Sequence, residues 1–194
     1  GPASEGITEN DGPFITRLSV SKENPDLVMA VGANGLYRTI SFGRAWRSIY
    51  INENWVRDGY ISSSHNVEFS LANGKIVCAG GGMTTENGLK MFVSTDEGMS
   101  FEAVNDYTTV PMPYYISGLA THPIEEETAY VLYAAAGVPK ILRATDLGQT
   151  WEDISGFGTG TSSSNGYPDV VTSCLLVMPH NPDIIWAGTD IGLF

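Results

Sequence analysis

The sequence predicts an all-β fold made of repeated units, and three observations support this prediction. An eight-residue pattern that ends in an aromatic residue occurs at residues 94–101 and 144–151, with a degenerate copy at 39–46. The closing aromatic residues of the three copies are 55 and 50 residues apart, a period typical of propellers and solenoids. Between the copies, short apolar or alternating runs are separated by Gly, Asn, Asp and Pro, as expected for strands joined by turns.

The repeated pattern, which we call the box turn, has the composition of a tight turn. In residues 144–151 an Asp is followed two positions later by Gly, and a Trp closes the pattern. The carboxylate can accept hydrogen bonds from main-chain amides just ahead of it, and Gly adopts a positive φ without strain. The aromatic side chain then begins the next strand and packs against the sheet. We expect a structural role for Ser94, Asp96, Gly98, Phe101, Asp146, Gly148, Trp151, Gly43 and Trp46.

These three copies resemble the Asp-box, or BNR, repeat of sialidases, sortilin-type receptors and xyloglucan-degrading endoglucanases. The resemblance implies a β-propeller with four-stranded antiparallel blades. It also implies that each box turn joins the third and fourth strands of a blade, away from the ligand-binding face. In this geometry the first-to-second and third-to-fourth turns share one face, and the remaining loops share the other.

The chain divides into a lead-in at residues 1–13 and repeats at 14–51, 64–106, 116–156 and 171–194. The opening Gly-Pro-Ala-Ser is similar to the remnant of a cleaved tag. In the second repeat we expect a long loop at residues 80–88, between strands at 75–79 and 90–94. The fourth repeat stops in its third strand, so the prediction is a partial propeller of about three and a half blades. Since closed propellers have four to eight blades, the expected partners are the remaining blades or a second copy.

The composition indicates a globular domain and argues against several functions. Hydrophobic residues make up 42% of the chain and charged residues 16%. The formal net charge of −12 argues against binding to nucleic acid or to anionic membranes, and no apolar run is long enough to insert into a membrane. Cys78 and Cys174 lie in apolar runs and are interpreted as buried free thiols. No spacing of residues predicts a metal or a cofactor.

Aromatic residues are concentrated in the loops of the other face, where they stand beside carboxylates and amides. Such loops suit sugars, which stack on aromatic rings, and equally suit a protein partner. The alternative is that these aromatics pack between blades. The candidate ligand-binding residues are Trp55, Arg57, Asp58, Tyr60, Tyr107, Tyr114, Tyr115, Tyr167 and Asp169.

The favoured function is an extracellular or periplasmic scaffold that binds glycans or proteins, although no export signal is visible. One alternative is a fragment of a polysaccharide-degrading glycoside hydrolase. Its weak catalytic candidate is Asp190, whose Thr-Asp-Ile-Gly context is similar to a stretch that carries a catalytic Asp in xyloglucan-cleaving propellers. Hydrolysis needs a second carboxyl group, which the sequence does not identify. The other alternative is a protein-assembly or receptor scaffold.

Overall fold

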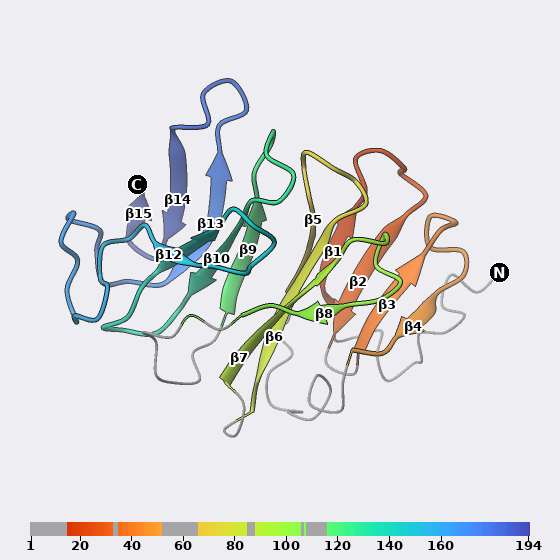
Figure 1. Ribbon diagram of the computed structural model, residues 1–194, viewed down its shortest axis with the longest axis horizontal. Coiled ribbons are helices and arrows are strands. Elements are labelled where there is room, and N and C mark those ends of the chain that lie inside the picture. The colour runs from red at the N-terminus through yellow and green to blue at the C-terminus, as the bar shows by residue number, and fades with distance from the viewer. Residues whose placement is uncertain (1–14, 33–34, 52–65, 85–87, 106, 108–115) are drawn as a thin grey trace.

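A computed structural model describes residues 15–32, 35–51, 66–84, 88–105, 107 and 116–194, which form an all-β fold of four sheets (Figure 1). Blade one contains β1 (Ile15–Val20), β2 (Val28–Gly32), β3 (Gly35–Thr39) and β4 (Arg47–Ile49). Blade two contains β5 (Asn66–Phe69), β6 (Val77–Thr84), β7 (Gly88–Ser94) and β8 (Glu102–Ala103). Blade three contains β9 (Ile116–Thr121), β10 (Ala129–Tyr133), β11 (Ile141–Ala144) and β12 (Glu152–Asp153). Blade four contains β13 (Thr172–Val177), β14 (Ile185–Thr189) and β15 (Gly192–Leu193).

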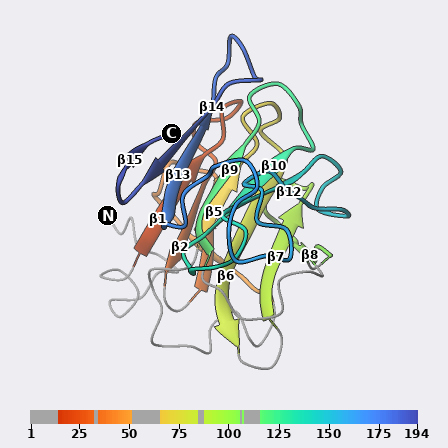
Figure 2. The same cartoon turned by 90° about the vertical axis from the view of Figure 1, so that its left-hand side faces the viewer.

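Each blade is an antiparallel sheet whose strands lie in the order of the sequence. The first strands are neighbours across the blades, since β5 packs against both β1 and β9, and β13 packs against β9. The blades therefore follow one another from blade one, near the N-terminus, to blade four, near the C-terminus (Figures 1 and 2). No helix in the described part of the chain is long and apolar enough to cross a membrane.

The hydrophobic core lies between the blades rather than within any one of them. The cluster between blades one and two contains Leu27, Met29, Val31, Leu36, Ile49, Val67, Phe69, Val77, Ala79 and Phe92. Equivalent clusters lie between blades two and three and between blades three and four. A strand that is covered on both faces has a continuous apolar sequence, such as the buried Ala129–Tyr133 of blade three.

Matching main-chain hydrogen bonds align the four repeats residue by residue. The turn after the first strand is closed by bonds from Ser21 N to Leu27 O, Ser70 N to Ile76 O, His122 N to Thr128 O and Met178 N to Ile184 O. Two positions beyond the acceptor, the equivalent residues on the second strand are Met29, Cys78, Tyr130 and Trp186. Met29, Cys78 and Tyr130 belong to the core clusters shared with the next blade, and the four side chains differ greatly in size.

The three box turns share one backbone conformation. Their central residues have consecutive positive φ values, with Phe42, Glu97 and Leu147 at 50°, 63° and 57° and Gly43, Gly98 and Gly148 at 83°, 79° and 81°. Each turn is closed by a main-chain hydrogen bond, from Arg44 N to Ser41 O, Met99 N to Asp96 O and Gln149 N to Asp146 O. Two positive φ values in succession describe a type I′ turn, whose twist matches that of the flanking strands.

The side chain at the first corner of each box turn holds the turn closed. Asp96 Oδ1 accepts from Met99 N (3.0 Å) and Ser100 N (2.9 Å), and Asp96 Oδ2 accepts from Ser100 Oγ (2.6 Å). Partial desolvation opposes ionisation, but hydrogen bonds from Ser100 and Ser94 outweigh it and lower the pKa of Asp96 to about 2. In the degenerate copy a hydroxyl takes this place, because Ser41 Oγ accepts from Ala45 N (3.2 Å).

Two expectations from the sequence are wrong. The long loop expected at 80–88 is largely an extended hairpin, because β6 runs to Thr84 and β7 begins at Gly88. Glycine is needed at the start of this stretch, since a Cβ at Gly80 would lie 2.9 Å from Ile116 Cδ1. Both cysteines are free, but only Cys78 is buried, and Cys174 is exposed. Cys174 lies on the first strand of blade four, most of whose residues are not fully buried.

Candidate binding sites

The molecule presents two faces, which we call the box-turn face and the loop face. Each box turn bonds to the first-to-second turn of its own blade, through Phe42 N to Asp26 O (3.0 Å), Glu97 N to Lys75 O (2.9 Å) and Leu147 N to Glu127 O (3.2 Å). These bonds place the two kinds of turn side by side, as expected for a propeller. The described residues of the loop face, at the opposite ends of the strands, are the second-to-third turns of blades three and four and the connection between these two blades.

Most of the candidate ligand-binding residues lie outside the described residues. These are Trp55, Arg57, Asp58, Tyr60, Tyr114 and Tyr115. The structure describes the other three, Tyr107, Tyr167 and Asp169. Tyr107 is partly buried and packs against the core cluster between blades two and three. Tyr167 and Asp169 belong to the connection between blades three and four.

Asp169 anchors this connection to the second-to-third turn of blade three. Its Oδ1 lies 2.5 Å from Lys140 Nζ, and Gly137 N donates to Oδ1 (2.9 Å) and Oδ2 (3.0 Å). The fully buried Lys140 side chain also donates to Ala135 O and lies 5.2 Å from the centre of the Phe157 ring. The hydrogen bond from Lys140 holds the pKa of Asp169 below its usual range. The carboxylate is therefore an ionised partner of a buried cation.

The rest of the same connection is held by its own polar side chains. Ser163 Oγ donates to Ser155 O (2.7 Å) and accepts from Tyr167 N (3.0 Å), while Asn165 Nδ2 donates to Ile154 O (3.1 Å). Tyr167 Oη and Thr172 Oγ1 are 2.7 Å apart. These contacts fix the backbone of a connection whose residues 158–162 are exposed.

Asp190, the weak catalytic candidate, is exposed in the turn between β14 and β15. Thr189 shapes this turn, since its Oγ1 donates to Gly192 O (2.8 Å) and accepts from Ile191 N (3.3 Å). Within the described ranges, no three His, Cys, Asp or Glu side chains lie close enough together to hold a metal ion.

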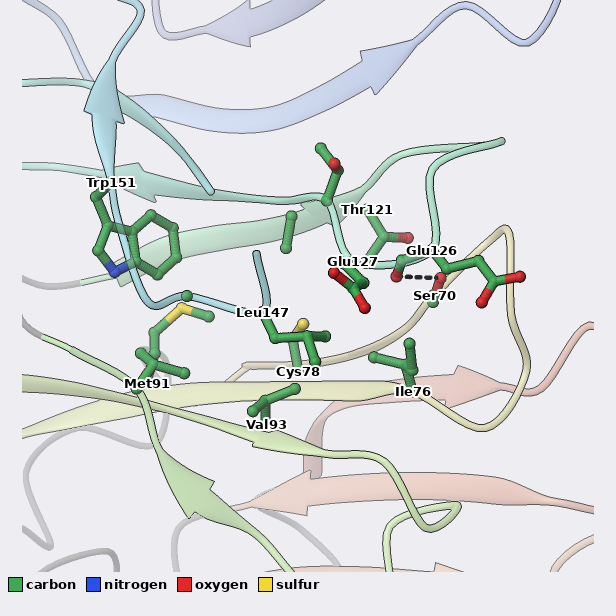
Figure 3. A pocket seen from close by; sticks show the side chains of 14 residues that line it. Ser70, Ile76, Cys78, Met91, Val93, Thr121, Glu126, Glu127, Leu147 and Trp151 are labelled. Atoms are coloured by element: carbon green, nitrogen blue, oxygen red, sulfur yellow. Dashed lines mark hydrogen bonds between the residues drawn. The ribbon is translucent and has the colours of Figure 1, made fainter. Parts of the chain in front are cut away.

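A narrow cleft opens on the box-turn face between blades two and three, and the sequence analysis did not predict it (Figure 3). Its volume of about 330 Å³ includes open solvent, and the space between its walls is about the size of one water molecule. Its lining residues are Ser70, Ile76, Cys78, Met91, Val93, Val104, Thr121, Glu126, Glu127, Thr128, Ala129, Leu147, Gly148 and Trp151. Trp151 stands at one end of the cleft and Ile76 at the other, with Cys78 and Leu147 between them (Figure 3).

Comparing equivalent positions in the repeats explains why the cleft lies at this interface. At the first interface the Met29 side chain fills the corresponding space, since a Cβ on Gly98 would come within 2.7 Å of Met29 Sδ. Cys78 has the same position in blade two but a shorter side chain. Likewise, Arg38 bonds to Glu97 O across the first interface (2.7 Å), whereas its equivalent in blade two is Val93. Two substitutions by smaller residues therefore leave space between blades two and three.

No family model and no curated protein sequence matches the chain. Among solved structures, it is similar to the GH74 enzyme of Niastella koreensis, with a TM-score of 0.72 and 14% identity over 98% of this chain and 28% of that one. It is also similar to the GH74 xyloglucanase of Xanthomonas campestris, with a TM-score of 0.65 and 13% identity over 100% and 29%. A structure of YCF48 bound to D1 peptide has a TM-score of 0.56 and 18% identity over 91% and 48%.

The chain thus spans from about a quarter to about a half of the length of these proteins. At such low identity the comparisons establish the fold alone. Together with the four successive antiparallel sheets, they show that the chain is a partial β-propeller.

Proposed function

We propose that this partial propeller is a non-catalytic, extracellular scaffold that binds a glycan or a protein through its loop face. The observation that carries this proposal is the fixed connection between blades three and four. The Lys140–Asp169 ion pair and the Ser163 hydrogen bonds hold it in place, so a ligand need not order it on binding. The aromatic residues of the other connections, such as Trp55 and Tyr114, are of the types that stack on sugars.

The similarities to two kinds of solved structure each favour an alternative function. The likeness to GH74 enzymes favours a fragment of a glycoside hydrolase, with Asp190 as its catalytic candidate. The peptide-bound YCF48 structure favours a scaffold for protein partners. An extracellular location is supported by the similar extracellular domain of a putative one-component system from Bacteroides thetaiotaomicron (TM-score 0.55, 15% identity). If the chain were part of a hydrolase, Asp169 would be a poor general base, because its carboxylate is already paired with Lys140.

Isothermal titration calorimetry of the chain with xyloglucan oligosaccharides, and separately with peptides from a library, tests the proposal. We expect Trp55→Ala to weaken binding of the ligand found by about tenfold or more while leaving the unfolding midpoint unchanged. Phe42→Ala, which removes an exposed aromatic side chain from the box-turn face, is the matched control and should leave binding intact.

Two results would contradict this proposal. Release of reducing sugar from xyloglucan that is abolished by Asp190→Asn would identify a hydrolase. A large loss of stability in Trp55→Ala would place that side chain in the core and not in a binding site.

A further inference from the structure

We propose that a second copy of this chain docks head to tail, so that blade four of one copy packs against blade one of the other. The side of blade one that faces away from blade two is called the head face. The side of blade four that faces away from blade three is called the tail face. The two faces lie at opposite ends of the row of blades (Figure 1). Neither belongs to the loop face, so this proposal does not depend on the function proposed above.

The head face carries apolar side chains whose equivalents in the next blade are buried. Leu18 and Val20 lie on β1, and the bonds that close the first-to-second turns align them with two residues of β5. Those residues, Val67 and Phe69, are each 2% exposed and belong to the core cluster between blades one and two. Leu18 and Val20 are instead 62% and 49% exposed. Blade one therefore presents to solvent the surface that blade two buries against the blade before it.

The first box turn adds an aromatic side chain to the head face. In the other two box turns the equivalent residue contacts the preceding blade, since Glu97 pairs with Arg38 of blade one and Leu147 lines the cleft beside blade two. Phe42 has the same place in blade one and is 69% exposed. A bulky residue at a positive φ is uncommon in a turn that only faces water. Its position instead suits contact with a neighbouring blade.

The tail face offers the other half of the same interface. Three of its exposed apolar residues are equivalent to residues of blade one that are buried beneath blade two, as the first-to-second turns and the strand pairing show. They are Ile184, Trp186 and Leu193 in blade four, and Leu27, Met29 and Leu36 in blade one. The buried three belong to the same core cluster as Val67 and Phe69. A contact between the tail face and a head face would therefore repeat the packing of blade one against blade two.

A second copy is favoured over an unrelated partner, because a blade of this kind carries the matching surface. Each copy exposes both halves of the interface at once, one at each end. The contact is heterologous, since it joins two different faces, and such contacts form a ring where the rotation closes. Four sheets in each of two copies make eight, which is within the range of closed propellers. We therefore expect a closed dimer with two identical contacts.

Two variants, one for each face, test the docking. Trp186→Glu disables the tail face and Leu18→Glu the head face, because docking would bury a carboxylate without a partner. In sedimentation velocity we expect the parent chain to form dimers and each variant alone to associate at least about tenfold more weakly. Both side chains are exposed, so both variants should keep the unfolding midpoint of the parent.

A mixture of the two variants tests the direction of docking. The Trp186→Glu copy keeps an intact head face and the Leu18→Glu copy an intact tail face, so one undamaged contact can form between them. Native mass spectrometry, with one variant labelled with ¹⁵N, distinguishes these mixed dimers from the others. Mixed dimers should appear but be weaker than those of the parent, because one contact replaces the two of a ring.

A control variant and a change of salt separate apolar docking from effects of charge. Met99→Glu, at an exposed position in the box turn of blade two, adds the same charge away from both faces and should dimerise as the parent does. Sodium chloride at about 0.5 M should strengthen the parent dimer. It screens the repulsion between copies that each carry a formal net charge of −12.

Three results would overturn the proposal. A parent chain that stays monomeric at high concentration would leave the two faces to an occupant other than a second copy. Parent-like dimers of Leu18→Glu, with no mixed dimers, would show that two tail faces pair with each other. Unchanged dimers of both variants would place the contact elsewhere. None of these results bears on the loop face, whose ligand is tested separately.

Discussion

Glu68 is a carboxyl group whose surroundings resist its ionisation. It lies on β5, the first strand of blade two, where Ser19 Oγ of blade one donates to its Oε1 (3.2 Å). Burial raises the pKa of Glu68 to about 6, and the contacts with Ser19 and Arg17 only partly oppose this. Folding therefore favours the protonated carboxyl. The free energy of unfolding should decrease as the pH rises from about 4.5, the ordinary value, to about 6.

Replacing Glu68 by glutamine should remove this decrease. We expect Glu68→Gln to be more stable than the parent chain at pH 7.5, by up to about 2 kcal/mol, and to differ little at pH 4. Urea unfolding at the two pH values measures the difference, with Glu102→Gln as an exposed control. A Glu68→Gln variant that is equally destabilised at both pH values would show that the hydrogen bond from Ser19 matters more than ionisation.

At the scale of elements, the box turn serves both its own blade and the contact with the blade before it. The main-chain N–H of Glu97 bonds to Lys75 O within blade two, whereas its carbonyl accepts from Arg38 of blade one. Gly98 touches Met29 of blade one in the same turn. A small turn therefore fixes the spacing between neighbouring sheets.

Adding a methyl group at Gly98 should break this contact. Gly98→Ala imposes a side chain where φ is 79° and places its Cβ 2.7 Å from Met29 Sδ. We expect a loss of about 2–4 kcal/mol in urea unfolding. Gly166→Ala, with φ of 86° and no atom within 4 Å of the added Cβ, isolates the backbone cost and should lose only about 1 kcal/mol. Equal losses in the two variants would mean that the contact with Met29 contributes nothing.

The sequence predicted the elements well where a local pattern determines them. Asp and Gly at fixed spacing predicted the turns at residues 96–98 and 146–148, and continuous apolar runs predicted the central strands. The glycines at 80–82 misled the prediction, because their composition is typical of a loop, whereas β6 continues through them and pairs with β7.

The candidate sites were harder to predict, because they depend on contacts between repeats. Asp169 and Lys140 belong to two different loops, so no pattern within a short stretch of sequence predicts that they form an ion pair. The cleft arises from a difference between equivalent residues. An alignment of the repeats that compared Met29, Cys78 and Tyr130 would have shown a small residue at the second interface.

At the scale of the whole molecule, the outer face of blade four is the surface expected to receive another sheet. Trp186 is 43% exposed, whereas its equivalents Met29 and Tyr130 are 0% and 1% exposed beneath the next blade. Leu176, Ile184 and Leu193 are also exposed apolar residues of blade four. Such a patch favours association with a further blade or with a second copy.

Trp186→Glu should therefore reduce self-association of the purified chain. We expect the parent chain to form dimers or larger species with rising concentration in sedimentation velocity, and the variant to remain monomeric, because a carboxylate on this face would be costly to bury. Ile124→Glu, at an exposed apolar position in the first turn of blade three, is the control. A parent chain that remains monomeric at high concentration would contradict a role for this face in pairing two copies.

The order of strands in the sheets has a consequence for how the chain acquires its structure. Within each blade the strands pair in the order of the sequence, and blades two, three and four each pack against the blade that precedes them. The strands of blade one can therefore form their hydrogen bonds before the last strands have been synthesised. Each later blade can then pack against a blade that has already folded. Assembly should proceed in the direction of translation, with each finished blade acting as the template for the next.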